Sequence, residues 1–114
     1  MKNDKFKIIE FMRKLIIYFD KILINFPKKE LELKTILINE LYYTLKLLYI
    51  TNDMKKSDNK IDNKGQIISN IKFISFIIDR CYDKKIITNK EYLNIGYMLN
   101  NIMKYLNGWL KANI

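Results

Sequence analysis

Three lysines near the start of the chain have the spacing that most clearly suggests a chemical role. Lys7, Lys14 and Lys21 recur every seven residues, so on a helix they lie nearly in line, ~10 Å apart. Such a row, flanked by Arg13, could contact successive phosphates of a nucleic-acid backbone. An ordinary solvated helix face has the same pattern. Both interpretations stay open from the sequence alone.

The other basic residues are spread along the chain instead of being gathered in a tail. Lys and Arg number 21 against 12 Asp and Glu, which gives a net charge of +9 and a pI near 9.6. Dispersed charge favours contact with the phosphate backbone over the reading of base edges. The residues we expect to bind nucleic acid are Lys7, Arg13, Lys14, Lys21, Lys28, Lys29, Lys72, Arg80 and Lys104.

Tyrosines offer a second chemistry, because an aromatic ring can stack on an unpaired base. The chain has eight of them. Tyrosine is also common at the edge of a helical core and in subunit interfaces, and we expect that structural role for most of them. They are Tyr18, Tyr42, Tyr43, Tyr49, Tyr82, Tyr92, Tyr97 and Tyr105.

No combination of residues predicts catalysis or metal binding. The chain has no histidine and one cysteine, Cys81, which excludes Ser/His or Cys/His nucleophile pairs, a zinc cluster and an internal disulfide. The closest carboxylate pairs, Glu30 with Glu32 and Asp79 with Asp83, lack a third acidic partner. We therefore expect a non-enzymatic protein with no metal site and no cofactor, in which Cys81 is a small core residue.

The composition predicts a helical protein. Apolar residues make up 49 % of the 114 residues, whereas there are only 3 Gly and 1 Pro, so an all-β fold with many tight turns is disfavoured. The length fits one domain, residues 1–114. No apolar stretch reaches the length of a membrane span, and a lone thiol fits a reducing compartment. We expect a cytoplasmic protein with no membrane partner.

Apolar residues repeat at intervals of three and four, which predicts four helices at about 4–24, 30–51, 61–84 and 89–112. Pro27 separates the first two helices, and the polar segment 52–60 is the longest predicted loop. Thr88 and Glu91 have the spacing of a capping box at the start of the fourth helix. Four long helices with short connections predict an antiparallel up-down four-helix bundle.

Each predicted helix carries an apolar seam for the core, and two helices carry more. The seam of the second helix is Leu37, Leu41, Leu45 and Leu48, and that of the third is Ile67, Ile71, Ile74, Ile78 and Cys81. Trp109 lies on the seam of the fourth helix, where we expect it to be buried. The surplus apolar residues of the second and fourth helices would be buried by self-association.

Three short segments carry a resemblance to a known family. They are Asn-Phe-Pro-Lys at 25–28, Ile-Thr-Asn-Lys-Glu-Tyr at 87–92 and Tyr-Leu-Asn-Gly-Trp-Leu at 105–110. With this order and spacing, the chain resembles, from about Phe6 to Ala112, the accessory variability determinant (Avd) proteins of diversity-generating retroelements. It is similar, more broadly, to their relatives encoded in ribosomal RNA intervening sequences.

The resemblance implies a basic four-helix bundle that forms a homopentamer and binds RNA or DNA without strong sequence preference. It also implies a reverse transcriptase partner and a role in copying template RNA into mutagenised cDNA. Our leading hypothesis is therefore a non-enzymatic scaffold for these components. The alternative is an oligomeric bundle of the intervening-sequence type with no reverse transcriptase partner. A membrane-surface or purely structural helical protein is less favoured, because the lysines are dispersed.

Overall fold

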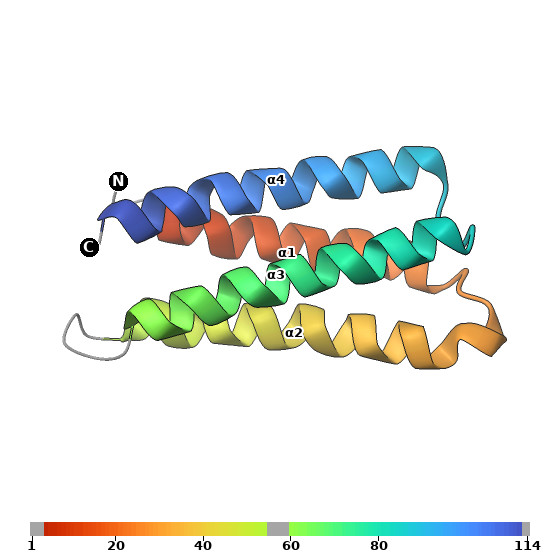
Figure 1. Cartoon of the computed structure of the whole chain (residues 1–114), viewed down its shortest axis with the longest axis horizontal. Helices are drawn as coiled ribbons and strands as arrows, with labels where there is room; N and C mark the ends of the chain where they lie inside the picture. The colour runs from red at the N-terminus through yellow and green to blue at the C-terminus, as the bar shows by residue number, and fades with distance from the viewer. Residues whose placement is uncertain (1–3, 55–59, 113–114) are drawn as a thin grey trace.

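The computed structural model describes residues 4–54 and 60–112, and within these ranges it contains four α-helices and no strand (Figure 1). The helices are α1 (Asp4–Leu23), α2 (Leu31–Asp53), α3 (Lys60–Asp83) and α4 (Asn89–Ala112), and a short 3-10 helix, η1 (Lys28–Glu30), precedes α2. The ranges expected from the sequence differ from these bounds by at most two residues at any end. The all-helical class is confirmed. Of the predicted long loop, residues 55–59 lie outside the described residues.

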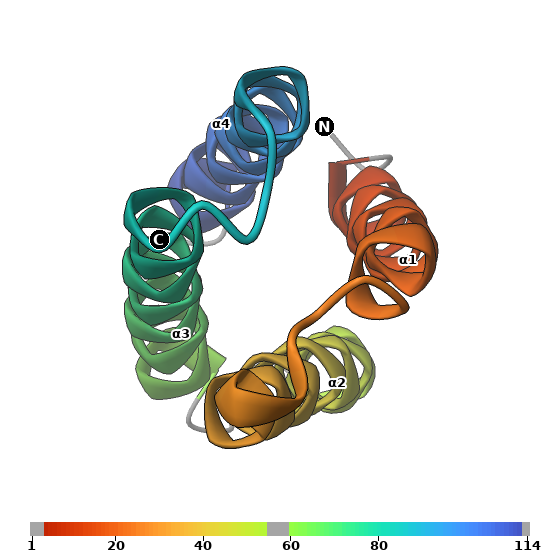
Figure 2. The ribbon, with the colours of Figure 1, turned by 90° about the vertical axis from the view of Figure 1, so that its right-hand side faces the viewer.

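The four helices lie side by side along the long axis of the molecule, which measures 46 × 23 × 19 Å (Figure 1). Seen end on, they occupy the corners of a four-sided arrangement in the order α1, α2, α3, α4 (Figure 2). Neighbours are therefore α1 with α2, α2 with α3, α3 with α4, and α4 with α1. Across the diagonals, no Cα atom of α1 lies within 8 Å of one in α3 in the described ranges, and the same holds for α2 and α4. The α1–α2 face and the α3–α4 face consequently lie on opposite sides of the molecule.

The core is one continuous apolar cluster to which all four helices contribute. All five predicted seam residues of α3 are buried, and Trp109 on α4 is only 4 % exposed, so its expected burial is confirmed. Each fully buried Ile or Leu contributes about 1.5–3 kcal/mol relative to an exposed one.

The seam of α2 differs from the prediction at its centre. Leu45 is only half-buried, whereas Leu47 and two threonines, Thr44 and Thr51, are buried. Each threonine hydroxyl donates to the backbone carbonyl four residues earlier, at 2.7 Å. These bonds satisfy the hydroxyl groups inside the helix, so burying them leaves no unpaired donor.

The turn between α3 and α4 begins with main-chain hydrogen bonds to the last turn of α3. Lys85 has a positive φ of 61°, its N–H donates to the carbonyl of Tyr82, and the N–H of Ile86 donates to the carbonyl of Cys81, both at 2.9 Å. This is the Schellman motif that ends many helices, with lysine in the left-handed position that glycine usually occupies.

The predicted capping box at the start of α4 is confirmed. The Thr88 N–H donates to Glu91 Oε1 at 2.8 Å, and the Glu91 N–H donates to Thr88 Oγ1 at 3.1 Å. Two backbone donors that the helix itself cannot satisfy therefore have partners. None of the described helices is long and apolar enough to cross a lipid bilayer.

The first and last helices pack against each other over aromatic side chains. The rings of Phe11 and Tyr105 lie 5.4 Å apart between centroids, and Asn94 Nδ2 donates to Tyr18 Oη at 3.2 Å. These contacts join residues at opposite ends of the sequence.

Candidate nucleic-acid interface

The basic row of α1 is exposed, because the apolar face of this helix is turned to the core. Lys7, Lys14 and Lys21 are all exposed. Lys7 Nζ lies 5.5 Å from the centroid of the Tyr105 ring, and Lys14 Nζ lies 6.0 Å from that of Phe11. Because these two rings pack together between α1 and α4, the ammonium groups of Lys7 and Lys14 are turned toward the α4 side of α1.

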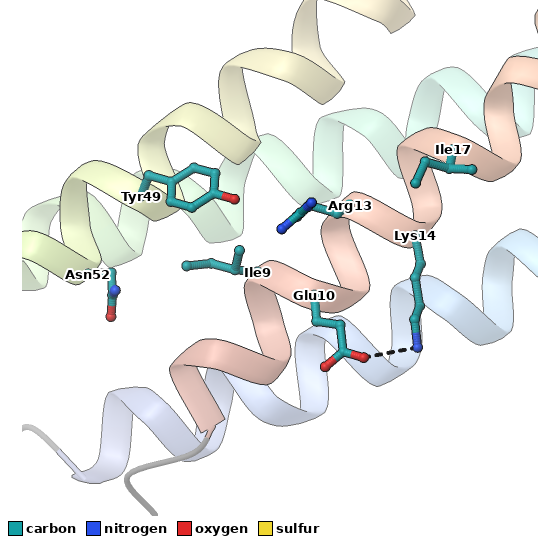
Figure 3. A pocket seen from close by; sticks show the side chains of 7 residues that line it. All are labelled: Ile9, Glu10, Arg13, Lys14, Ile17, Tyr49 and Asn52. Atoms are coloured by element: carbon teal, nitrogen blue, oxygen red, sulfur yellow. Dashed lines mark ion pairs between the residues drawn. The ribbon is translucent and has the colours of Figure 1, made fainter.

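A groove lies on the other flank of α1, between α1 and α2, and has a volume of about 540 Å³ (Figure 3). Figure 3 shows the Arg13 guanidinium and the Tyr49 phenol pointing toward each other from the two helices. Residues from both helices line the groove: Ile9, Glu10, Arg13, Lys14 and Ile17 from α1, and Tyr49 and Asn52 from α2.

The two basic side chains of the groove, Lys14 and Arg13, differ in whether they form an ion pair. Lys14 Nζ forms an ion pair with Glu10 Oε1 at 3.1 Å, and both side chains are about 60 % exposed. An exposed pair of this kind contributes about 0.2–1 kcal/mol, so an incoming anion can readily replace it. Arg13 makes no ion pair and no hydrogen bond with the part of the chain that the structure describes. Its guanidinium is the groove's available cation.

The groove also contains a polar atom without a partner. Asn52 Oδ1 is buried and accepts no hydrogen bond from the described residues. A buried carbonyl oxygen in this state has lost its contact with water without receiving a donor in exchange.

The nine basic residues expected to bind nucleic acid are all exposed, but they do not form one surface. Arg13 and Lys14 line a common groove. Lys28 and Lys29 lie in η1, Lys104 lies on α4, and Lys72 and Arg80 lie on α3, which is diagonal to α1. The residues therefore surround the molecule.

Tyr49 is the groove residue whose position the sequence did not predict. Its spacing in α2 places it off the predicted seam of Leu37, Leu41, Leu45 and Leu48. It becomes part of the groove because α1 is the neighbouring helix on that flank of α2. Periodicity within one helix carries no information about which helix lies alongside.

A buried lysine forms a second unexpected feature. Lys64 on α3 is 1 % exposed, its Nζ donates to the Trp109 carbonyl oxygen at 3.3 Å, and it lies 4.5 Å from the centroid of the Trp109 ring. An ammonium group can be buried when hydrogen bonds and an aromatic face replace its water. This cation stabilises the end of α4 and is not available to a ligand.

The single thiol is unsuited to act as a nucleophile. Burial, with a further contribution from the Glu30 carboxylate, raises the pKa of Cys81 from 9.0 to about 11, so the group is protonated at neutral pH. On α4, the pKa of Tyr92 is raised mainly because its hydroxyl donates to Asp79 Oδ1 at 2.6 Å. Across residues 4–54 and 60–112 there is no group of three or more side chains able to hold a metal ion.

At the level of class, the chain is an all-helical protein of four helices with an excess of exposed basic side chains. Comparison with protein-family models, with curated protein sequences and with solved structures found no match.

Proposed function

We propose that this chain is an antiparallel up-down four-helix bundle and a non-enzymatic nucleic-acid-binding accessory protein of a diversity-generating retroelement. In this role it acts in the cytoplasm as an oligomer that holds a reverse transcriptase and its template RNA or cDNA together. The observation that carries the proposal is the exposure of all nine expected basic side chains over α1, η1, α3 and α4. Charge distributed in this way suits contact with phosphates, independent of sequence.

Exposed apolar side chains support the oligomeric part of the proposal. Large ones occur on every helix, and several are more than half exposed, so association between copies would bury apolar surface. They include Ile17, Ile24, Leu31, Tyr42, Phe76, Leu93 and Tyr97. A homopentamer, as the family resemblance implies, would cover part of this surface.

The oligomer is tested by light scattering on the purified protein at micromolar concentration. Five copies of 13.8 kDa give an expected mass of about 69 kDa. A monomeric mass would contradict the pentamer and leave the exposed apolar side chains without a partner.

Nucleic-acid binding is tested by measuring affinity for mixed-sequence RNA and DNA over a range of salt concentrations. The affinity should fall steeply with salt and depend little on sequence, because bound lysines release counterions. The triple change Lys7→Glu, Lys14→Glu and Lys21→Glu should weaken binding to every sequence and reduce the salt slope by about two to three. Far-UV circular dichroism should show unchanged helicity. Unchanged binding would mean that the α1 row is only a solvated face.

The alternative function, an intervening-sequence-type bundle without a reverse transcriptase partner, uses the same fold and the same basic surface. The neighbouring genes distinguish the two. An adjacent reverse transcriptase gene with a template and variable repeat pair supports the retroelement role. A position inside a ribosomal RNA operon supports the alternative and removes the reverse transcriptase from the proposal.

A further inference from the structure

We infer that the groove between α1 and α2 holds one unstacked base of a single-stranded nucleic acid on the ring of Tyr49, while Arg13 binds the adjoining phosphate. This inference rests on the proposed nucleic-acid binding and adds to it the form of strand that is bound. The dispersed lysines contact any phosphate backbone, whereas the groove accepts only a base that has left the stack.

The walls of the groove provide an apolar slot with one aromatic face. Tyr49 is 42 % exposed on the α2 side, and Ile9 and Ile17 supply aliphatic surface on the α1 side. The volume of about 540 Å³ is within the range of pockets that take small organic ligands. Every base has a π-face, so stacking on Tyr49 would not depend on sequence.

The charged side chains of the groove suit a phosphate next to that base. Arg13 points toward Tyr49 (Figure 3) and is free of partners in the described chain. A guanidinium can donate two parallel hydrogen bonds to one phosphate. Lys14 lies at the edge of the groove, where its Nζ pairs with Glu10 and points away from Tyr49 (Figure 3), so Arg13 is the cation for that phosphate.

Charge favours this occupant over a second copy of the chain. The groove is lined by Arg13 and, at its edge, by the ion pair of Lys14 with Glu10, so its net charge is positive. A second copy that covered it would have to provide a carboxylate for Arg13 or bury an unpaired guanidinium, which is costly. A nucleotide brings its own negative charge together with a flat apolar ring. A duplex cannot offer such a ring to the groove, because its bases are stacked inside the double helix.

The test compares Tyr49→Leu with Tyr97→Leu. Both changes remove an exposed tyrosine ring from a helix and keep an apolar side chain, but Tyr97 lies on α4, on the opposite face of the molecule. Binding is measured by fluorescence anisotropy with single-stranded oligo(dT) and oligo(U) and with a DNA duplex of equal length at one salt concentration. Tyr49→Leu should weaken single-strand binding at least fivefold, as the loss of one stacked base predicts. Its duplex affinity, and both affinities of Tyr97→Leu, should stay within twofold of the unsubstituted protein.

A photochemical measurement makes the test independent of any substitution. A single strand carrying 5-iodouracil crosslinks under light to an aromatic ring on which the base stacks, and mass spectrometry should locate the link at Tyr49. Crosslinks only at other tyrosines would overturn the inference. Comparison of oligo(dT) with oligo(U) shows whether the ribose hydroxyl contributes.

Failure of the inference and failure of the proposed function have different signatures. If the protein binds nucleic acid but Tyr49→Leu has no effect on single-strand affinity, the groove assignment is wrong and the proposed function stands. If the unsubstituted protein binds neither strand form, the proposed function is wrong. If Tyr49→Leu lowers the mass of the oligomer, the groove is a contact between copies, which also overturns the inference.

Discussion

Substitution of the buried lysine, Lys64→Met, should destabilise the protein although methionine keeps most of the apolar stem. The Lys64 ammonium group donates to the Trp109 carbonyl at 3.3 Å and lies 4.5 Å from the centre of its ring. That carbonyl belongs to the last turn of α4, where the helix supplies no donor. Removing the cation therefore removes both a helix cap and a cation–π contact.

The expected loss of stability in Lys64→Met follows from these two contacts and from the cost of burying a charge. A hydrogen bond from a charged donor contributes about 1.5–3 kcal/mol, and a desolvated cation–π contact contributes about 2 kcal/mol. Relief of the ammonium's desolvation offsets part of this, so we expect a net loss of about 2 kcal/mol. For a protein of this length that corresponds to a Tm lower by roughly 8 °C.

A double-mutant cycle with Trp109→Leu separates the contributions. Leucine at this position removes the ring but keeps the backbone carbonyl, so in that background Lys64→Met should cost about 2 kcal/mol less. Stability is measured by urea unfolding followed by circular dichroism, at one protein concentration because oligomers shift apparent stability. Lys72→Met on the exposed face of α3 is the control and should stay within about 0.5 kcal/mol.

The reasoning would be refuted in two ways. If Lys64→Met leaves the free energy of unfolding unchanged, the cost of desolvating the ammonium group equals the energy of its contacts. The buried lysine then does not stabilise the fold. If the two substitutions are additive, the ring contributes nothing to holding the cation.

Four further predictions concern single residues. Lys85→Gly should stabilise the protein by about 1 kcal/mol, because glycine adopts the positive φ of the α3–α4 turn without strain; a lower Tm would contradict this. Thr88→Ala should cost about 1 kcal/mol by removing half of the capping box, measured by the same urea unfolding. Asn70→Leu should raise stability by about 1 kcal/mol, since Asn70 Nδ2 is buried without an acceptor in the described structure. Because the pKa of Cys81 rises from 9.0 to about 11 on folding, the folded state holds this proton more tightly. The free energy of unfolding should therefore fall between pH 9 and 11. For the Cys81→Ala variant it should fall less over that interval.

The helices could be predicted because their signals are local. Apolar residues at intervals of three and four identify the buried face of α3, and the capping box at Thr88 marks the start of α4. Both signals lie within about one helix, so no knowledge of tertiary structure is needed to interpret them.

The prediction of the core was wrong where a polar side chain is buried, because its partner cannot be identified from the local sequence. A sequence pattern assigns Lys64 to the surface because of its charge, and only the nearby end of α4 makes its burial possible. Thr44 and Thr51 were not expected in the seam because they are polar, yet each hydroxyl finds a carbonyl on its own helix. Local composition indicates which groups need partners, but not where the partners are.

The candidate groove was predictable only in part. Exposure of Arg13 and Lys14 follows from the helical pattern, because they lie opposite the apolar face of α1. That Tyr49 faces Arg13 depends on the lateral order of the helices, which the sequence specifies only through the complete packing.

The packing of α1 against α4 has a consequence for folding kinetics. The other three helix contacts join consecutive helices, whereas the bond between Asn94 and Tyr18 closes a loop that spans 76 positions. Closing such a loop carries the largest loss of chain entropy, so this contact should form last. Substitutions at Phe11 or Tyr18 should then accelerate unfolding while leaving the folding rate nearly unchanged. The α1–α4 contact would thus set the lifetime of the folded state.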